Sequence, residues 1–226
     1  MAQANNYTIE NFDPEVLREY DIRGVVGENI NENTAYTIGR TFGHTVKLKL
    51  SSHTIVTGYD GRLTSPSLHK ALCEGLKDSG SKVLNIGMGP TPMTYFAHYH
   101  FEADAAVMLT GSHNPSEYNG FKMVFNKHSF YAEDIQSLQK LIDNNELELL
   151  EGQIIEKNIT NEYIDRDLLN ISLNRKLKVA WDPGNGAMGK VTRDIFEKLI
   201  NSENVIINEE VDGNFPNHHP DPTVPK

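Results

Sequence analysis

The residues with the most evident capacity for chemistry lie in one short segment, LTGSHNPSEYNGFKMV (109–124). A hydrophobic run ends at Leu109, and a Gly-Ser-His-Asn-Pro turn follows with Ser112 at its second position. An Asn-Gly-x-Lys sequence ending at Lys122 comes a few residues later. Together they supply a hydroxyl, hydrogen-bond donors and a cation. That set suits a phosphate carried on the serine, because phosphoserine is close to doubly charged at neutral pH.

The residues alone leave a structural alternative open for this turn. Ser112 or Asn114 can instead cap a helix or satisfy the turn itself. A Ser-His-Asp hydrolase is disfavoured, because the Gly-x-Ser-x-Gly elbow is absent.

Three further polar loops would lie near the serine turn in an α/β sheet, since ligands gather beyond the carboxyl ends of its strands. The first, REYDIRG (18–24), carries Arg23. The second, GYDGRLTSP (58–66), places Arg62 just before an expected helix. The third, DPGNGAMG (182–189), exposes backbone N–H groups at a helix N-terminus and suits an anion. Isolated arginines also form ordinary surface ion pairs, and Gly-Asn-Gly is also an ordinary turn.

Strands alternate with helices along the chain, which predicts an α/β sandwich with a largely parallel sheet. Ser65 and Thr91 are the expected N-caps of two helices, each followed by a proline in the first turn. The polar, mostly acidic segment 143–158 is interpreted as a boundary, so two domains are expected, the second small. Strands are expected at 54–60, 82–87, 105–109, 121–125, 177–181 and 204–211, and helices around 35–46, 65–79, 91–100, 135–142, 163–171 and 195–199.

Composition narrows the class of protein. The 226 residues are 38% hydrophobic and 23% charged, as expected for a globular protein with a substantial core. The net charge is −10 without a block of Lys or Arg, so no nucleic-acid surface is expected, although converging cations can still bind a small anion. The single cysteine, Cys73, excludes an intrachain disulfide and is expected to be a buried spectator. Neither a signal peptide nor a membrane span is apparent, so a cytoplasmic location is expected.

The serine segment resembles the active-serine signature of the α-D-phosphohexomutases, and within them it is most similar to the bacterial phosphomannomutase/phosphoglucomutase branch. EYDIRG, GYDGRLTSP and FPNHHPDPTVP resemble the same family in the same order, and these matches span nearly the whole chain. The phosphoglucosamine mutase branch usually has Ala-Ser-His-Asn-Pro, so Gly111 favours the mannose/glucose branch.

The resemblance implies an α/β fold of two three-layer domains with mainly parallel mixed sheets, the first half of a four-domain enzyme. Residues 1–150 would form domain I with the active serine loop. Residues 151–226 would form domain II, which is incomplete or ends at the boundary of domain III.

The resemblance further implies a phosphotransferase that interconverts hexose 1-phosphate and hexose 6-phosphate of mannose or glucose. Ser112 would carry the phosphoryl group, a hexose 1,6-bisphosphate would be the intermediate, and Mg²⁺ would bind an oxygen of the phosphoserine. Lys122 is the expected acid/base, supported by His113. The residues expected in catalysis are Ser112, His113, Lys122 and Arg23. Those expected to bind substrate are Tyr20, Arg62, Asn114 and Asn119.

Three motifs of the family do not occur in these 226 residues: the Asp-x-Asp-x-Asp-Arg metal loop, the Gly-Glu-x-Ser-Gly sugar loop and the C-terminal phosphate loop. The chain alone is therefore expected to be inactive. His218, His219 and Asp221 are not expected to bind a metal, because their Pro-flanked loop matches the end of the family's second domain. Three alternatives stay open: a non-catalytic phosphosugar-binding or interaction module, a phosphoglucosamine mutase fragment, and a serine phosphohydrolase.

Overall fold

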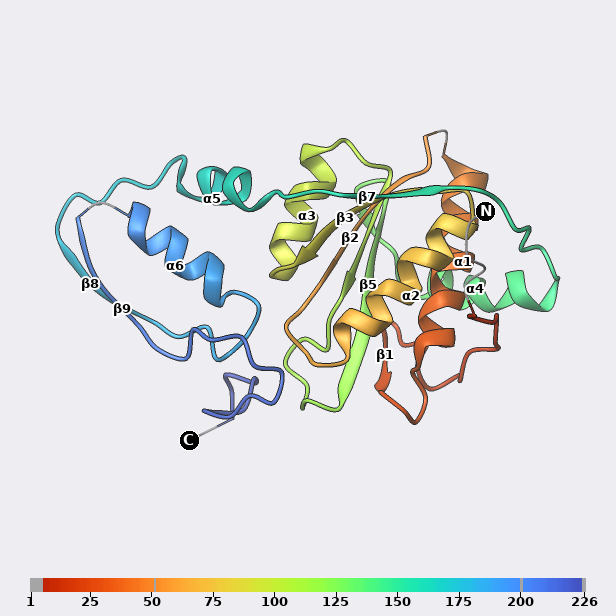
Figure 1. Ribbon diagram of the computed structural model, residues 1–226, viewed down its shortest axis with the longest axis horizontal. Coiled ribbons are helices and arrows are strands. Elements are labelled where there is room, and N and C mark those ends of the chain that lie inside the picture. The colour runs from red at the N-terminus through yellow and green to blue at the C-terminus, as the bar shows by residue number, and fades with distance from the viewer. Residues whose placement is uncertain (1–5, 51, 200, 225–226) are drawn as a thin grey trace.

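A computed structural model describes residues 6–50, 52–199 and 201–224 (Figure 1). The strands are β1 Ile22–Val25, β2 Thr54–Tyr59, β3 Lys82–Met88, β4 Ala105–Leu109, β5 Tyr118–Phe125, β6 His128–Ser129, β7 Gln153–Glu156, β8 Leu177–Trp181 and β9 Ser202–Ile206. The helices are α1 Glu32–Lys49, α2 Ser65–Asp78, α3 Thr91–His100, α4 Glu133–Asp143, α5 Thr160–Leu168 and α6 Gly189–Lys198. The alternation of strands and helices confirms the expected α/β class.

The larger sheet has the strand order β1-β5-β4-β2-β3-β7, with β6 on β5. Strands β4, β2, β3 and β7 are parallel, whereas β1 and β6 pair antiparallel with β5, which itself runs antiparallel to β4. All five residues of β4 are buried, which explains the uninterrupted hydrophobic run in front of the serine turn. The sheet is therefore mixed.

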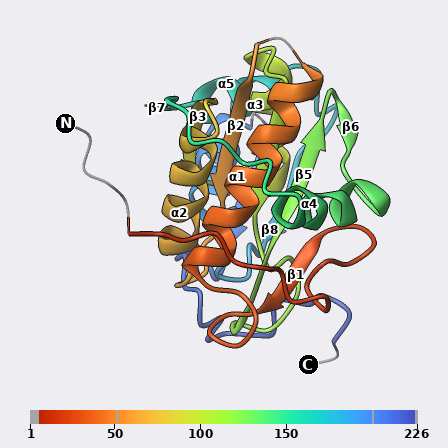
Figure 2. The ribbon, with the colours of Figure 1, turned by 90° about the vertical axis from the view of Figure 1, so that its right-hand side faces the viewer.

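Helices cover both faces of this sheet. Figures 1 and 2 show α1, α2 and α4 on one side and α3 on the other. Side chains of successive strand residues point to opposite faces, so Ile55 and Val107 join the core under α1 and α2, whereas Val56 and Ala106 join the core under α3. The second core also receives residues of α5 and α6, so one layer of apolar side chains links the two parts of the chain.

Helix α1 is fixed at its start and along its contact with α2. The Asn31 side chain accepts hydrogen bonds from the backbone N–H groups of residues 33 and 34, and Thr34 bonds back to the Asn31 backbone, which forms a capping box. A Cβ added at Gly39 would lie 2.4 Å from the Leu72 carbonyl oxygen, and one added at Gly75 would lie 2.2 Å from the Tyr36 carbonyl oxygen. Glycine at both positions lets the two backbones approach each other.

Two expected helix caps are wrong. Helix α2 begins at Ser65 itself, and its N-cap, Thr64, makes no side-chain cap bond. The Ser65 hydroxyl donates to Asp60 Oδ1 at 2.6 Å and accepts from Asn119 Nδ2 at 3.0 Å, so tertiary partners take both of its hydrogen-bonding roles. Helix α3 begins at Thr91, with Pro90 as its N-cap.

The structure also has three strands that the sequence did not indicate, one of which is the two-residue β6, His128–Ser129. Strand β1 lies inside the REYDIRG loop, and β7 lies inside the segment interpreted as a boundary. Both are four residues long, and each pairs with a neighbour that is distant in sequence, so no local pattern marks them. Strand β5 starts at Tyr118, three residues earlier than expected, and β9 spans 202–206 in place of 204–211.

The second part of the chain holds β8 and β9, a parallel pair, with α6 against it (Figure 1). Val191 and Ile195 of α6 are buried in the second core. After β9 the chain returns to the edge of the larger sheet where the serine turn lies. None of the helices in the described residues has the length and apolar character needed to cross a membrane.

Candidate active site

The serine turn begins where β4 leaves the core. Ser112 has a φ of 55°, in the left-handed region, and its backbone N–H donates to Thr110 Oγ1 at 2.9 Å. The Asn114 N–H donates to the Gly111 carbonyl at 3.1 Å, which closes the turn. A left-handed non-glycine residue costs roughly 1–2 kcal/mol, and such strain persists only where surrounding contacts over-determine the backbone.

Arg62 supplies those contacts. Its guanidinium donates through Nη2 to the carbonyls of Ser112 and Asn114 at 3.1 and 2.7 Å, and through Nη1 to the carbonyl of Pro115 at 2.5 Å. The side chain is only 1% exposed. A Cβ added at Gly111 would lie 2.3 Å from Arg62 Nε, so a glycine is needed where the turn passes the guanidinium. The sequence suggested that Arg62 contacts substrate. In the structure its guanidinium donors are instead bonded to the backbone of the serine turn.

Asp60 joins the Arg62 loop to the turn. Its Oδ2 accepts from Arg62 Nε and from the Gly111 N–H, both at 3.1 Å. Its Oδ1 accepts from the Arg62 N–H at 3.1 Å and from the Ser65 hydroxyl at 2.6 Å. Asp60 Oδ2 thus links Arg62 to the turn, whereas Oδ1 holds the residues at the start of α2.

Asn119 links the strand after the serine turn to the start of α2. It is fully buried, and its Nδ2 donates to Thr64 Oγ1 and Ser65 Oγ, each at 3.0 Å. Because β5 starts at Tyr118, Asn119 lies in a strand and not in the turn. The Asn119 amide, which the sequence suggested as a substrate-binding group, is thus buried, and its Nδ2 is occupied by two hydroxyl oxygens.

Two cations share one carboxylate next to the turn. Asp21 Oδ2 accepts from Arg23 Nη2 at 2.5 Å and from Lys122 Nζ at 3.0 Å. Arg23 Nη1 also donates to Asn114 Oδ1 at 2.8 Å. Strand pairing brings these residues together: Arg23 lies opposite Gly120, and Lys122 lies opposite Met108 of β4.

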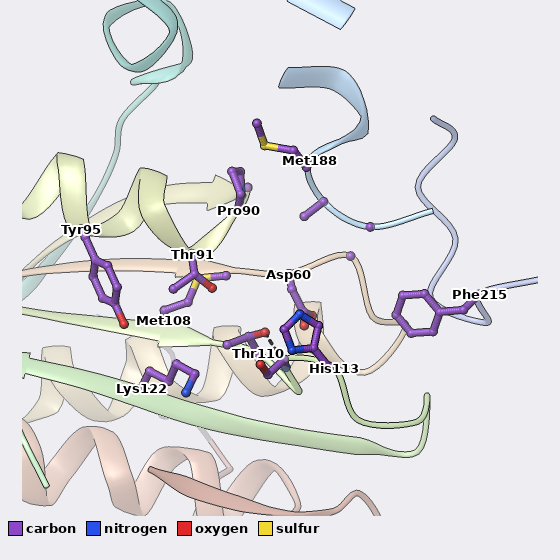
Figure 3. Close-up of a pocket in the computed structure, with 15 residues that line it drawn as sticks. Asp60, Pro90, Thr91, Tyr95, Met108, Thr110, His113, Lys122, Met188 and Phe215 are labelled. Carbon is purple, nitrogen blue, oxygen red and sulfur yellow. Dashed lines mark hydrogen bonds between the residues drawn. The ribbon is translucent and has the colours of Figure 1, made fainter. Parts of the chain in front are cut away.

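A cavity of about 500 Å³ opens above the turn. Ser112, His113 and Lys122 line it together with Tyr95 of α3 (Figure 3). Burial raises the pKa of the Tyr95 phenol, and the negative charge of Asp21 adds to the shift, so the hydroxyl keeps its proton at neutral pH. The cavity therefore brings a hydroxyl, an imidazole, an ammonium and a phenol together.

The second part of the chain supplies one wall of this cavity. The backbone of residues 186–188 at the start of α6 and the ring of Phe215 lie across from the serine turn (Figure 3). Tyr20, an expected substrate-binding residue, does not line the cavity and is 72% exposed.

Comparison with known proteins divides the chain into the same two parts, one before and one after β7. A family model described as phosphoglucomutase/phosphomannomutase, alpha/beta/alpha domain I, matches residues 14–148, and the model of domain II matches residues 160–226. The chain belongs to the phosphoglucomutase/phosphomannomutase family. Strand β7 lies between the two matched regions and extends the sheet of the first.

Relatives of known name support this membership. The chain is 44% identical to a phosphomannomutase/phosphoglucomutase of Pseudomonas syringae, over 92% of this chain and 44% of the relative. It is 40% identical to a phosphoglucomutase of Neisseria gonorrhoeae, over 94% of this chain and 46% of the relative. A crystal structure of a family protein from Burkholderia thailandensis superposes with a TM-score of 0.88 at 38% identity, covering 94% of this chain and 48% of that one. The chain thus spans less than half the length of these relatives.

The phosphohexomutase resemblance implies a magnesium ion, and the residues present can be tested for it. Within residues 6–50, 52–199 and 201–224, no group of three or more His, Cys, Asp or Glu side chains could hold a metal ion. Asp60 lines the cavity, but its oxygens already accept four hydrogen bonds. The described residues therefore do not by themselves fit the implied ion.

Sequence reasoning missed the two carboxylates that organise the site. Asp21 and Asp60 both lie in loops that the sequence singled out for their arginines, Arg23 and Arg62. The position of an acidic residue next to an arginine in sequence does not show which backbone N–H or cation its carboxylate will bind. Tyr95 was missed because its helix was assigned from an expected cap and a proline, which do not show which side of the helix faces the cavity. Cys73 is buried, as expected, and burial raises the pKa of its thiol to about 12, which makes it a poor nucleophile.

Proposed function

We propose that the complete protein interconverts hexose 1-phosphate and hexose 6-phosphate and that Ser112 carries the phosphoryl group. The observation that supports this most is the left-handed Ser112, held by Arg62 at the wall of a cavity that also contains Lys122. Phosphoryl transfer depends mainly on positioning and on stabilisation of charge, and four hydrogen bonds hold this turn, three from Arg62 and one to Asp60.

In the proposed cycle, a phosphorylated Ser112 donates its phosphoryl group to the free hydroxyl of the sugar phosphate. The hydroxyl oxygen forms a bond to phosphorus, the serine oxygen leaves, and hexose 1,6-bisphosphate results. The other phosphate of the bisphosphate then returns to the serine. The proton of the attacking sugar hydroxyl passes through Lys122 to the serine oxygen that leaves, and in the second transfer it passes from the serine hydroxyl to the leaving sugar oxygen, with His113 in support. Arg23 supplies charge, since a guanidinium does not give up a proton at neutral pH.

The remaining site residues divide by exposure. Arg62 and Asn119 act on the position of the turn, because both are buried and their donors are occupied. Asn114 and Tyr20 are the proposed substrate contacts, since both are accessible to solvent. The division of the chain into domain I (1–150) and domain II (151–226) belongs to the same proposal, with β7 contributed to the first sheet from beyond that point.

The proposal also covers the ligands, the location and the cofactor of the complete protein. Its ligands are hexose phosphates and hexose 1,6-bisphosphate, its location is the cytoplasm, and its cofactor is Mg²⁺. The ion would meet an oxygen of the phosphorylated Ser112, and its other ligands would come from outside the described residues.

A chimera tests the function. Residues 1–226 replace the matching part of the Pseudomonas syringae relative, and conversion of glucose 1-phosphate and mannose 1-phosphate is followed with added hexose 1,6-bisphosphate and Mg²⁺. We expect turnover in the chimera and its loss in Ser112→Ala, because only the carrier hydroxyl is removed. A shift of about 80 Da that maps to Ser112 should accompany turnover.

The outcomes separate the alternatives. A chimera that unfolds cooperatively but turns nothing over, while the parent relative is active in the same assay, would identify a non-catalytic binding module. Release of inorganic phosphate without formation of the isomer would identify a phosphohydrolase. Preferential turnover of glucosamine 1-phosphate would assign the phosphoglucosamine branch.

A further inference from the structure

The second part of the chain contacts the Arg62 loop through one short stretch, Val211–Phe215, which we call the docking segment. A Cβ added at Gly213 would lie 2.6 Å from the Leu63 nitrogen and 2.8 Å from the Arg62 Cα. Val211 Cγ1 would lie 2.3 Å from a Cβ at Gly61. At Gly213 the two backbones meet without an intervening side chain, so a displacement of one is passed to the other.

Phe215 completes this contact. Its ring lies over the Arg62 guanidinium, with 5.2 Å from Arg62 Cζ to the ring centroid. The guanidinium donates to three carbonyls and one carboxylate in its own plane, so an aromatic ring over the face provides contact where hydrogen bonds cannot. Phe215 is only partly buried, whereas Arg62 beneath it is almost completely buried.

Asn185, in the DPGNGAMG loop, anchors the docking segment. Its N–H donates to the Asn208 carbonyl at 2.8 Å, and its Nδ2 donates to the Glu210 carbonyl at 2.9 Å. Its own carbonyl accepts from the Asp212 N–H at 3.0 Å, and its Oδ1 accepts from Asn217 Nδ2 at 2.9 Å. Asn185 is 4% exposed and has a φ of 60°. The loop that the sequence suggested as an anion site thus has a defined structural task.

We propose that Phe215 is a positioning residue for the serine turn: it holds Arg62 in place, Arg62 holds the three carbonyls of residues 112, 114 and 115, and Asn185 fixes the segment that carries Phe215. The second part of the chain is in this way a component of the nucleophile's geometry and not only a wall of the cavity. The importance of that geometry rests on the proposed function, but the contacts themselves do not.

The test is nuclear magnetic resonance on the ¹⁵N-labelled 226-residue chain. The Arg62 Nε–H signal reports the stacked guanidinium, and the amides of residues 112–114 report the turn. In Phe215→Ala we expect the Arg62 Nε–H to lose its ring-current shift and to exchange with water about tenfold faster, which corresponds to about 1.4 kcal/mol. The heteronuclear NOE of the 112–114 amides should fall at the same time. Phe215→Tyr, which keeps the ring, should restore both.

Two controls and a second variant keep the result specific. The Arg40 Nε–H, on a buried arginine stacked on Tyr36 in α1, should not change. Val205→Ala, at a 61% exposed position of β9, should leave both reporters unchanged. Asn185→Gly tolerates the positive φ and removes only the side-chain bonds, so it should loosen the turn with Phe215 intact.

Two results would overturn the proposal. One is a Phe215→Ala chain in which the Arg62 signal is unchanged. The other is a changed Arg62 signal with rigid 112–114 amides, since the effect then does not reach the serine. If Phe215→Ala prevents folding, Asn185→Gly decides by the same criteria. No phosphoryl transfer is needed for these measurements, so their failure and a failed chimera assay are distinguishable.

Discussion

Replacement of Asp21 by asparagine should weaken the fold and strengthen phosphate binding at the same time. Asp21 Oδ2 contacts both Arg23 Nη2 and Lys122 Nζ, and its side chain is 8% exposed. Breaking a buried ion pair costs about 3–5 kcal/mol, but Arg23 and Lys122 are 18% and 29% exposed, so solvent offsets part of the loss. We expect Asp21→Asn to lower the free energy of unfolding by roughly 2–3 kcal/mol.

The same change removes the anion that competes with a substrate phosphate for the two cations. Unit charges 4 Å apart near a protein surface interact with about 4 kcal/mol before salt screening. We expect Asp21→Asn to bind inorganic phosphate about tenfold more tightly, which corresponds to about 1.4 kcal/mol of that interaction. Urea unfolding at pH 7 followed by circular dichroism gives the stability, and isothermal titration at low salt gives the affinity.

The matched control is Asp165→Asn. Asp165 is 70% exposed and pairs with Lys198 at 2.7 Å on the surface, so its loss should change stability by less than about 0.5 kcal/mol and leave phosphate binding unchanged. An Asp21→Asn chain as stable as the parent, or one with weaker phosphate binding, would refute the view that Asp21 is the counter-ion of both cations.

Four further predictions follow from single residues. Burial lowers the pKa of His69 to about 4, so the folded chain keeps His69 neutral at pH values where the unfolded chain, with a pKa of about 6.5, protonates it. The parent should therefore lose ~3 kcal/mol of its free energy of unfolding between pH 7 and pH 4, and His69→Gln should not show this loss. Urea unfolding at each pH measures both. Gly111→Ala should displace Arg62 and destabilise the chain by about 1–3 kcal/mol, measured by the same unfolding, and an unchanged midpoint would mean that the turn can move aside. In the chimera, Lys122→Arg should reduce kcat far more than tenfold although the charge is kept, and parental kcat would leave Lys122 as an electrostatic residue only. Cys73 should resist iodoacetamide in the folded chain and react once urea unfolds it; rapid labelling of the folded chain would contradict its burial.

The parts of the fold that the sequence predicted share a local cause. The end of the run Ala105–Leu109 marks the serine turn correctly, because a strand buried on both faces must be apolar throughout and must end where polar residues begin. Helix α4 was indicated by Ile135 and Leu138 at helical spacing, and both are buried.

The parts that it did not predict depend on partners distant in sequence. Arg62 and Asn119 were expected to face a substrate, but the path of the chain places them beneath the turn, and residue type says nothing about which side of a loop a side chain occupies. Ser65 has the residue type of a helix cap, yet Asp60 recruits its hydroxyl. Strand β7 lies in an acidic segment whose pairing with β3 only the folded sheet decides.

The strand order of the larger sheet has a consequence for how the chain folds as it leaves the ribosome. Strands β2, β3 and β4 are near one another in sequence and can pair early, and the serine turn is completed when β5 follows β4. Strand β1 is made first, but its partner strand in the sheet is β5, roughly one hundred residues later, so it cannot join the sheet until that partner is synthesised. Arg23 travels on β1 and Lys122 on β5. Arg23, the first-encoded cation of the site, is therefore added after the serine turn that it serves has formed.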